Sequence, residues 1–175
     1  MAQVVGGAWE YPGVLSQELR RLPGVARAIA EAAVDAVDAA RARDAEGLRE
    51  AADRLAAADS EHVGLVLGSV VRSLLEDLHP DGLASEDIQD VLEQCVRETL
   101  AWTVELDVDT LVVVLTGALG VHQQEDGAPR PDPRLLAWHA PVLLAYLLTV
   151  SGRRLDPYLS AAFAEIMRAE TVEMP

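Results

Sequence analysis

Apolar residues recur with the period of an α-helix along most of this chain, and this pattern limits the possible folds more than any other feature of the sequence. Within residues 61–78 and 85–102, the side chains that recur every three or four positions are mostly apolar. Such stripes predict amphipathic helices, because the strands of a sheet would alternate every second residue. The two stripes consist of Val63, Leu67, Val70, Leu74 and Leu78, and of Ile88, Leu92, Cys95, Thr99 and Trp102.

Turn and capping residues divide this pattern into seven or eight helices. We predict an all-α single domain, a multi-helix bundle or array over residues 14–170, with an N-terminal arm at residues 1–13 and a C-terminal tail at residues 171–175. Helix N-caps, two of them followed by proline, are expected at Asp44, Ser60, Asp132-Pro133 and Asp156-Pro157. The expected helices cover residues 15–22, 25–43, 45–58, 61–78, 85–102, 109–119, 134–151 and a last segment from Asp156.

Residues 109–119 (DTLVVVLTGAL) suit a strand as well as a helix, because three consecutive valines favour extended structure. No other segment of the chain has a composition that would give such a strand a partner. The helix is therefore the favoured interpretation, and its apolar character predicts a fully buried central helix. The connection that follows, residues 120–133, is longer than usual for a loop between helices.

The most apolar stretch is the predicted helix 134–151, which contains His139 and Pro141. As a helix, residues 135–150 would span about 24 Å, which is less than the roughly 30 Å of a bilayer core. We expect a buried core helix with no membrane role. Pro141 removes one backbone hydrogen bond and predicts a kink near residues 137–140.

Gly64 and Gly68 lie four residues apart within the predicted helix 61–78. Each glycine costs a helix about 1 kcal/mol relative to alanine. We expect a close crossing with another helix at this face to offset that cost.

The chain is strongly acidic, with 29 aspartates and glutamates against 14 arginines and no lysine, a formal net charge of −15. This charge argues against nucleic acid and anionic membrane surfaces as partners, since both require clustered cations. The absence of lysine excludes Schiff-base chemistry. Thirteen acids and two arginines lie within residues 61–125. Two interpretations stay open there: solvated helix faces, or an electronegative surface that steers a basic protein partner.

The sequence contains no recognisable catalytic, cofactor-binding or metal-binding motif. The pairs Asp59-x-x-His62 and Glu76-x-x-His79 have a metal-ligand spacing, but they stand at opposite ends of one predicted helix, about 25 Å apart. Cys95 lies in an amphipathic stripe and is expected to be a buried thiol. With a single cysteine and no signal-like pattern in residues 1–13, we expect a cytoplasmic protein.

Aromatic and histidine side chains supply the candidate binding residues. A ligand pocket around the kinked helix would use Trp102, Trp138, His139 and Tyr146. For His139, the alternative is a core histidine that hydrogen-bonds a backbone carbonyl near the kink. In the N-terminal arm, Trp9 and Tyr11 would either attach the arm to its own domain or insert into a second subunit.

Two functions follow from these observations. The first is a non-enzymatic interaction module that forms a homo-oligomer, most simply a homodimer, and presents an acidic surface to a basic protein. The second is a small-molecule-binding helical domain with its pocket around the kinked helix 134–151. A cavity of a few hundred cubic ångströms with converging polar groups would favour the second function.

Overall fold

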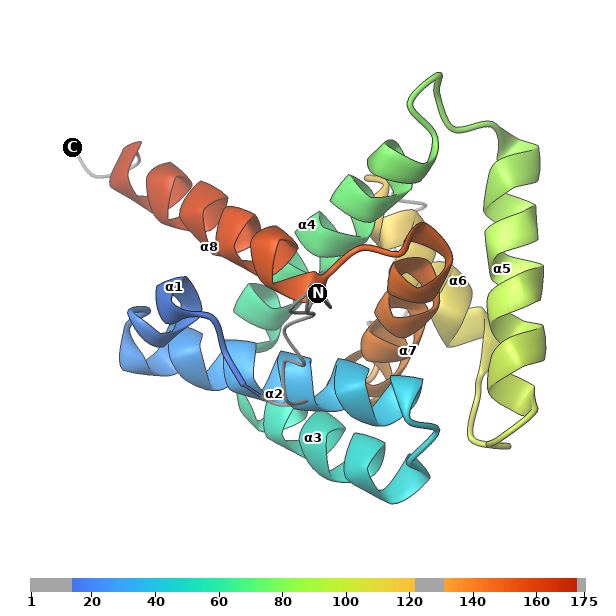
Figure 1. Ribbon diagram of the computed structural model, residues 1–175, viewed down its shortest axis with the longest axis horizontal. Helices are drawn as coiled ribbons and strands as arrows, with labels where there is room; N and C mark the ends of the chain where they lie inside the picture. The colour runs from blue at the N-terminus through green and yellow to red at the C-terminus, as the bar shows by residue number, and fades with distance from the viewer. Residues whose placement is uncertain (1–13, 122–130, 173–175) are drawn as a thin grey trace, which may run out of the picture.

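The computed structural model describes residues 14–121 and 131–172, and within these ranges the chain forms eight helices and no strand (Figure 1). The all-α, single-domain, multi-helix array predicted from the sequence is confirmed. The arm at residues 1–13 and most of the 120–133 connection lie outside the described residues. The helices are α1 (Gln17–Arg20), α2 (Gly24–Arg41), α3 (Ala45–Ala57), α4 (Ser60–Leu78), α5 (Ser85–Leu100), α6 (Val108–Ala118), α7 (Pro133–Ser151) and α8 (Leu155–Val172).

The α7 helix is the centre of the array, packed against α2, α3, α4 and α6. Every residue from 137 to 145 is buried, so the helix has no solvated face in its middle turns. By length and composition alone α7 could cross a membrane, but most of it lies inside the protein, as expected for a core helix. Pro141 does not interrupt the helix, which is continuous from Pro133 to Ser151; the kink expected there stays a prediction.

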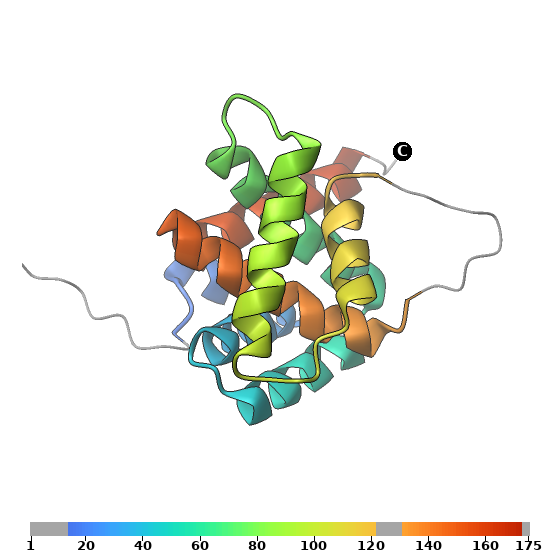
Figure 2. The same cartoon turned by 90° about the vertical axis from the view of Figure 1, so that its right-hand side faces the viewer.

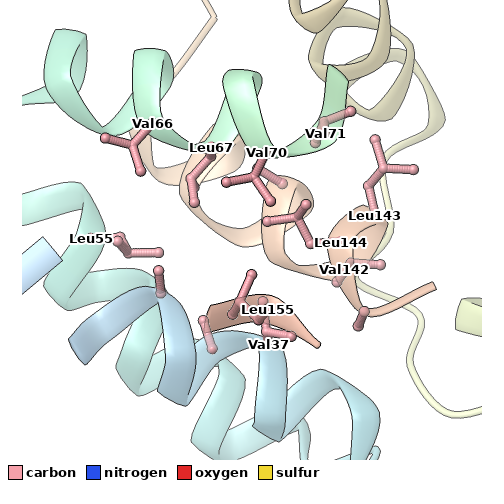
Figure 3. Packing of buried hydrophobic residues seen from close by; sticks show 14 of the residues in the cluster. Val37, Leu55, Val66, Leu67, Val70, Val71, Val142, Leu143, Leu144 and Leu155 are labelled. Carbon is pink, nitrogen blue, oxygen red and sulfur yellow. The ribbon is translucent and has the colours of Figure 1, made fainter. Parts of the chain in front are cut away.

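Close packing of aliphatic side chains fills the space between α7 and its neighbours (Figure 3). Leu55 of α3 and Val37 of α2 face the same interior as Val70 of α4 and Leu144 of α7. These four side chains are at most 1% exposed. Full burial of such a side chain contributes about 1.5–3 kcal/mol to folding, so this packing stabilises the domain.

The corner between α2 and α3 is a Schellman ending followed directly by a new helix. The backbone N–H groups of Arg43 and Asp44 donate to the carbonyls of Ala40 and Ala39, which closes α2. Arg43 occupies the left-handed position with φ 58°, where glycine is usual. The Asp44 carboxylate then accepts from the Gly47 N–H at 3.0 Å, which confirms the predicted N-cap of α3.

The last helix, α8, runs antiparallel to α4, and polar contacts join the two along their length. His62 Nε2 lies 3.0 Å from Glu170, and further along Tyr158 donates to the Asp77 carboxylate. Between them, the Ser69 hydroxyl is 3.4 Å from Glu165. The pairs His62–Glu170 and Asp77–Tyr158 therefore connect the ends of the two helices in opposite order.

The predicted caps of α4 and α8 and the predicted end of α8 differ from the structure. Asp59 rather than Ser60 caps α4, because its carboxylate accepts from the His62 N–H at 2.9 Å. Asp156 lies inside the first turn of α8, where its carboxylate accepts from the Ser16 N–H at 3.1 Å and joins α8 to the start of α1. α8 also continues to Val172, into the stretch predicted as a tail.

Residues 109–119 are helical, as favoured, but the expectation of a fully buried central helix was wrong. α6 buries Thr110, Leu111, Leu115 and Ala118, while Val113 on the other side is 40% exposed. The helix therefore lies at the surface, and α7 takes the central position.

The expected glycine crossing is present at one of the two positions. A Cβ atom on Gly68 would lie 3.9 Å from the Ala118 Cα, so α4 and α6 approach closely there, whereas Gly64 faces open space. Packing requires glycine at neither position, because a methyl group on Gly68 would make an ordinary van der Waals contact.

Candidate functional site

A small cavity of about 130 Å³ opens where the C-terminal ends of α2 and α5 meet the second half of α7. Figure 2 shows the end of α5 beside the end of α2, with α7 behind them. Known small-molecule sites usually measure 300–1,000 Å³, so this cleft has room for only a few heavy atoms. Its walls are Ala40, Arg41 and Arg43 from the end of α2, Glu98, Thr99 and Trp102 from the end of α5, and Val142, Ala145, Tyr146 and Thr149 from α7.

The structure brings together two of the four predicted ligand residues. Trp102 and Tyr146 both line this cleft. Trp138 and His139 do not line it; they lie earlier on α7, 7% and 1% exposed. The four residues therefore do not form one pocket. Three of them lie on α7, and Trp102 directly follows the end of α5.

Both ring nitrogens of His139 are bound to backbone groups. Nδ1 lies 2.7 Å from the Leu135 carbonyl and donates to it, while Nε2 accepts from the Asp107 N–H at 2.8 Å. This arrangement requires a neutral imidazole with its proton on Nδ1. Burial lowers the pKa of His139, although the Leu135 carbonyl and the Asp107 carboxylate favour the charged form. His139 thus joins α7 to the start of α6 and has no free nitrogen for a ligand.

Trp138 stands edge-on to His139, with ring centroids 4.7 Å apart and an interplanar angle of 62°. This is a favourable geometry for two aromatic rings. The buried indole Nε1 has no hydrogen-bond partner among the described residues. Trp138 therefore supports the position of His139 through ring packing.

The cleft carries opposite charges that the sequence reasoning did not identify. Arg41, Arg43 and Glu98 all line it, and no ion pair joins them within the described part of the chain. Burial raises the pKa of the Tyr146 phenol, and the negative charge of Glu98 adds to this effect. The available sequence signal was Arg43 itself, a charged residue at a helix ending where glycine is usual.

A second candidate surface is the outward stripe of α5 and the connection to α6, which we name the acidic face. Its acids Glu86, Asp90 and Glu93 are exposed and recur at helical spacing, and the stripe continues through Arg97 to Leu100. Residues 85–109 together hold eight acids and one arginine. The acidic face consists of Glu86, Asp90, Glu93, Arg97, Leu100, Val104, Glu105, Val108 and Asp109.

Three apolar side chains of the acidic face are exposed to solvent. Val104 is 91% exposed, Leu100 50% and Val108 42%. They lie within nine residues of chain and alternate with Glu105 and Asp109. An apolar centre bordered by charge is the usual composition of a protein interface.

Cys95 and the histidines His62 and His79 are the other reactive side chains outside the cleft in the described part of the chain. Cys95 is 0% exposed, and burial raises its pKa to about 12, so the thiol stays protonated at neutral pH. No group of three or more histidine, cysteine or acidic side chains within residues 14–121 and 131–172 is placed to hold a metal ion. His62 contacts two carboxylates, those of Asp59 and Glu170, and His79 contacts the Asp87 carboxylate.

Trp9 and Tyr11, the predicted interaction residues of the arm, lie outside the described residues. Their role and the homo-oligomer therefore stay predictions. Removal of residues 1–13 followed by light scattering tests the arm: loss of a dimer means that the arm holds a second subunit, and an unchanged oligomeric state rules out that role.

Comparisons of the chain with protein-family models, with curated proteins and with solved structures found no significant match. The functional interpretation therefore depends on the geometry of the two candidate surfaces.

Proposed function

We propose that this protein is an interaction module whose acidic face binds a basic, partly apolar segment of another protein. The observation that carries the proposal is the exposure of Val104, Leu100 and Val108 among carboxylates. Burial of these side chains against a partner would contribute about 25 cal/mol for each Å² of apolar surface removed from water. The carboxylates would select a partner that carries arginine or lysine beside its apolar residues.

The position of α5 in the array supports this proposal. α5 packs mainly against α6 and α7, and its fully buried residues are Val91, Cys95 and Thr99. The opposite side faces outward in Figure 2 and meets no other described helix. A partner could therefore cover the acidic face without displacing any part of the domain.

The connection between α5 and α6 is held in place before any partner arrives. Glu105 pairs with Arg49 of α3, and the Asp107 N–H donates to His139. The Thr103 hydroxyl also accepts from the Glu105 N–H at 3.2 Å. Because these contacts order the connection, little conformational entropy remains to be lost when Val104 becomes buried.

The test uses the full chain and a synthetic amphipathic helical peptide of lysine and leucine, with a matched peptide in which glutamate replaces lysine. We expect the basic peptide to bind, the acidic one not to bind, and added salt to weaken the complex. Fluorescence anisotropy of a labelled peptide measures both affinities.

The exposed valines supply matched variants for the same measurement. Val104→Ser should weaken binding of the basic peptide by about tenfold, which corresponds to 1.4 kcal/mol. Val25→Ser is the control, since Val25 is 70% exposed on α2, away from the acidic face. Equal binding of the two peptides, or equal weakening by both variants, would show that the acidic face is not the binding surface.

A further inference from the structure

A buried histidine joins the central helix to the exposed connection between α5 and α6, and its two hydrogen bonds fix its protonation state. The His139 imidazole is 1% exposed. Nδ1 lies 2.7 Å from the Leu135 carbonyl, which can only accept, and Nε2 lies 2.8 Å from the Asp107 N–H, which can only donate. A neutral ring with its proton on Nδ1 is the form that satisfies both partners. The contact with Asp107 therefore exists only while the ring is neutral.

A second proton on this ring would set two donors against each other. The charged imidazole carries an N–H on Nε2, and this group would point at the Asp107 N–H across 2.8 Å. The bond from Nδ1 to the Leu135 carbonyl could persist, whereas the bond at Asp107 could not. We propose that His139 is a proton-dependent latch, whose protonation releases the Asp107 backbone and the start of α6.

The Asp107 side chain offers the charged ring a new acceptor. Its carboxylate acts electrostatically on the imidazole and favours the charged form. In the latched state the same carboxylate caps α6, where it accepts from the Thr110 N–H at 3.3 Å and from the Thr110 hydroxyl. A charged imidazole would attract the carboxylate away from Thr110. Protonation would therefore also weaken the N-cap of α6.

Among the described residues, Asp107 is the charged group that acts on the ring. The buried residues of α2, α3 and α4 are all apolar, and the titratable residue that α5 buries, Cys95, stays protonated at neutral pH. The other charged side chains of the connection, α6 and α7 are exposed: Glu105, Asp109 and Arg134. Burial lowers the pKa of His139, so the latch is closed at neutral pH and opens as the pH falls below the usual value of 6.5.

The latch lies directly behind part of the acidic face. Val104 and Val108, 91% and 42% exposed, stand on either side of Asp107 in the chain. Release of the Asp107 backbone would change how these two side chains are presented. Control of partner binding by His139 rests on the proposed function, whereas the latch itself does not.

An NMR titration of the full chain, with the pH lowered from 7, tests the latch. We expect the Asp107 amide proton to move upfield with the same midpoint as the His139 ring, because its hydrogen bond is lost. The amide of Leu144, in the filled core, should keep its position over the same range. An Asp107 amide that stays constant while the ring titrates would overturn the proposal. So would a ring that stays neutral until the signals of Leu144 report unfolding of the whole domain.

Two histidine variants assign the response to one ring. His139→Gln should abolish the movement of the Asp107 amide, because its side-chain oxygen can accept from that N–H without titration. His62→Gln is the matched control, since the His62 side chain is 44% exposed on α4 and contacts only Asp59 and Glu170. This variant should respond as the natural chain does, and it keeps the test decisive if His139→Gln does not fold. A response that persists in His139→Gln, or disappears in His62→Gln, would overturn the assignment.

Binding of the basic peptide at pH 7 and pH 5 tests control of the acidic face. One proton changes an equilibrium by at most about tenfold per pH unit, so the natural chain should lose at least about fivefold more affinity than His139→Gln. Equal losses in the two chains would show that the latch does not control the acidic face. Absence of binding at pH 7 would count against the proposed function alone, because the NMR titration needs no partner.

Discussion

The two sides of α7 are built differently. On the side of α2, α3 and α4, aliphatic side chains fill the space, and long leucines such as Leu144 are fully buried. On the side of α5, the packing is shallower: Leu92 and Val96 are half-buried, and the cleft opens beside Tyr146. The first side is a filled core, and the second leaves part of the apolar surface of α5 in contact with solvent. The same central helix therefore borders a closely packed region and a more open one.

The largest expected contrast between these sides comes from truncation of one leucine on each. Leu144→Ala should cost about 2–5 kcal/mol of the free energy of unfolding, because it leaves a cavity in a filled core. Leu92→Ala should cost about 1 kcal/mol, since part of the side chain is already in water. Urea denaturation of the two variants measures the difference, and equal costs would contradict the comparison.

A second test concerns the contact that joins the two sides, His139 with the Asp107 N–H. Burial lowers the pKa of His139 in the folded state, so the imidazole binds a proton more readily in the unfolded chain. The stability that depends on neutral His139 is therefore fully present above pH 6.5, the usual value, and is lost as the pH falls below it. For one proton the slope is at most about 1.4 kcal/mol per pH unit.

His139→Gln provides the control for this pH dependence, because its side-chain oxygen can accept from the Asp107 N–H without titration near neutral pH. Urea denaturation from pH 7 to pH 5 should show a smaller slope for this variant than for the natural chain. The Asp107 carboxylate is the ionised group that faces the ring, and the Thr110 hydroxyl lowers its pKa, so its own loss of stability falls at lower pH. Identical slopes would mean that His139 does not titrate as described.

The smallest expected effect separates a packed helix face from an open one. Gly64→Ala should raise the free energy of unfolding by about 0.5–1 kcal/mol, because the new methyl group meets open space and alanine favours the helix. Gly68→Ala should gain at least as much, since its methyl group would also make an ordinary van der Waals contact with the Ala118 backbone. Thermal denaturation followed by circular dichroism measures both, and a loss of stability at Gly68 would contradict the described contact.

The helices of this fold could be predicted because their signals are local. Periodic apolar residues define α4 and α5, and Asp44 and Asp132 define two helix starts, as the structure confirms. Asp156 was misassigned because its carboxylate accepts a hydrogen bond from Ser16, far away in sequence. No local pattern contains that contact.

Local sequence patterns could not predict how deeply each helix is buried, nor which residues meet at the cleft. α6 has the composition of a buried helix, yet α7 fills the centre and leaves Val113 exposed. The cleft joins Arg41, Glu98 and Tyr146 from three helices, so its charges meet only after the chain has folded. Trp102 and Tyr146 could be selected as aromatic residues near the most apolar helix, whereas the arginines carried no comparable signal.

The hydrogen bond between His139 and the Asp107 N–H means that a buried residue holds the backbone of the exposed connection between α5 and α6. The imidazole is 1% exposed, and it anchors the backbone three residues after Val104. If the acidic face binds a partner as proposed, a substitution of His139 would weaken that binding, even where the rest of the domain still folded. Loss of partner binding in a chain with an intact helical spectrum would therefore direct attention inward, to a ring that no partner can touch.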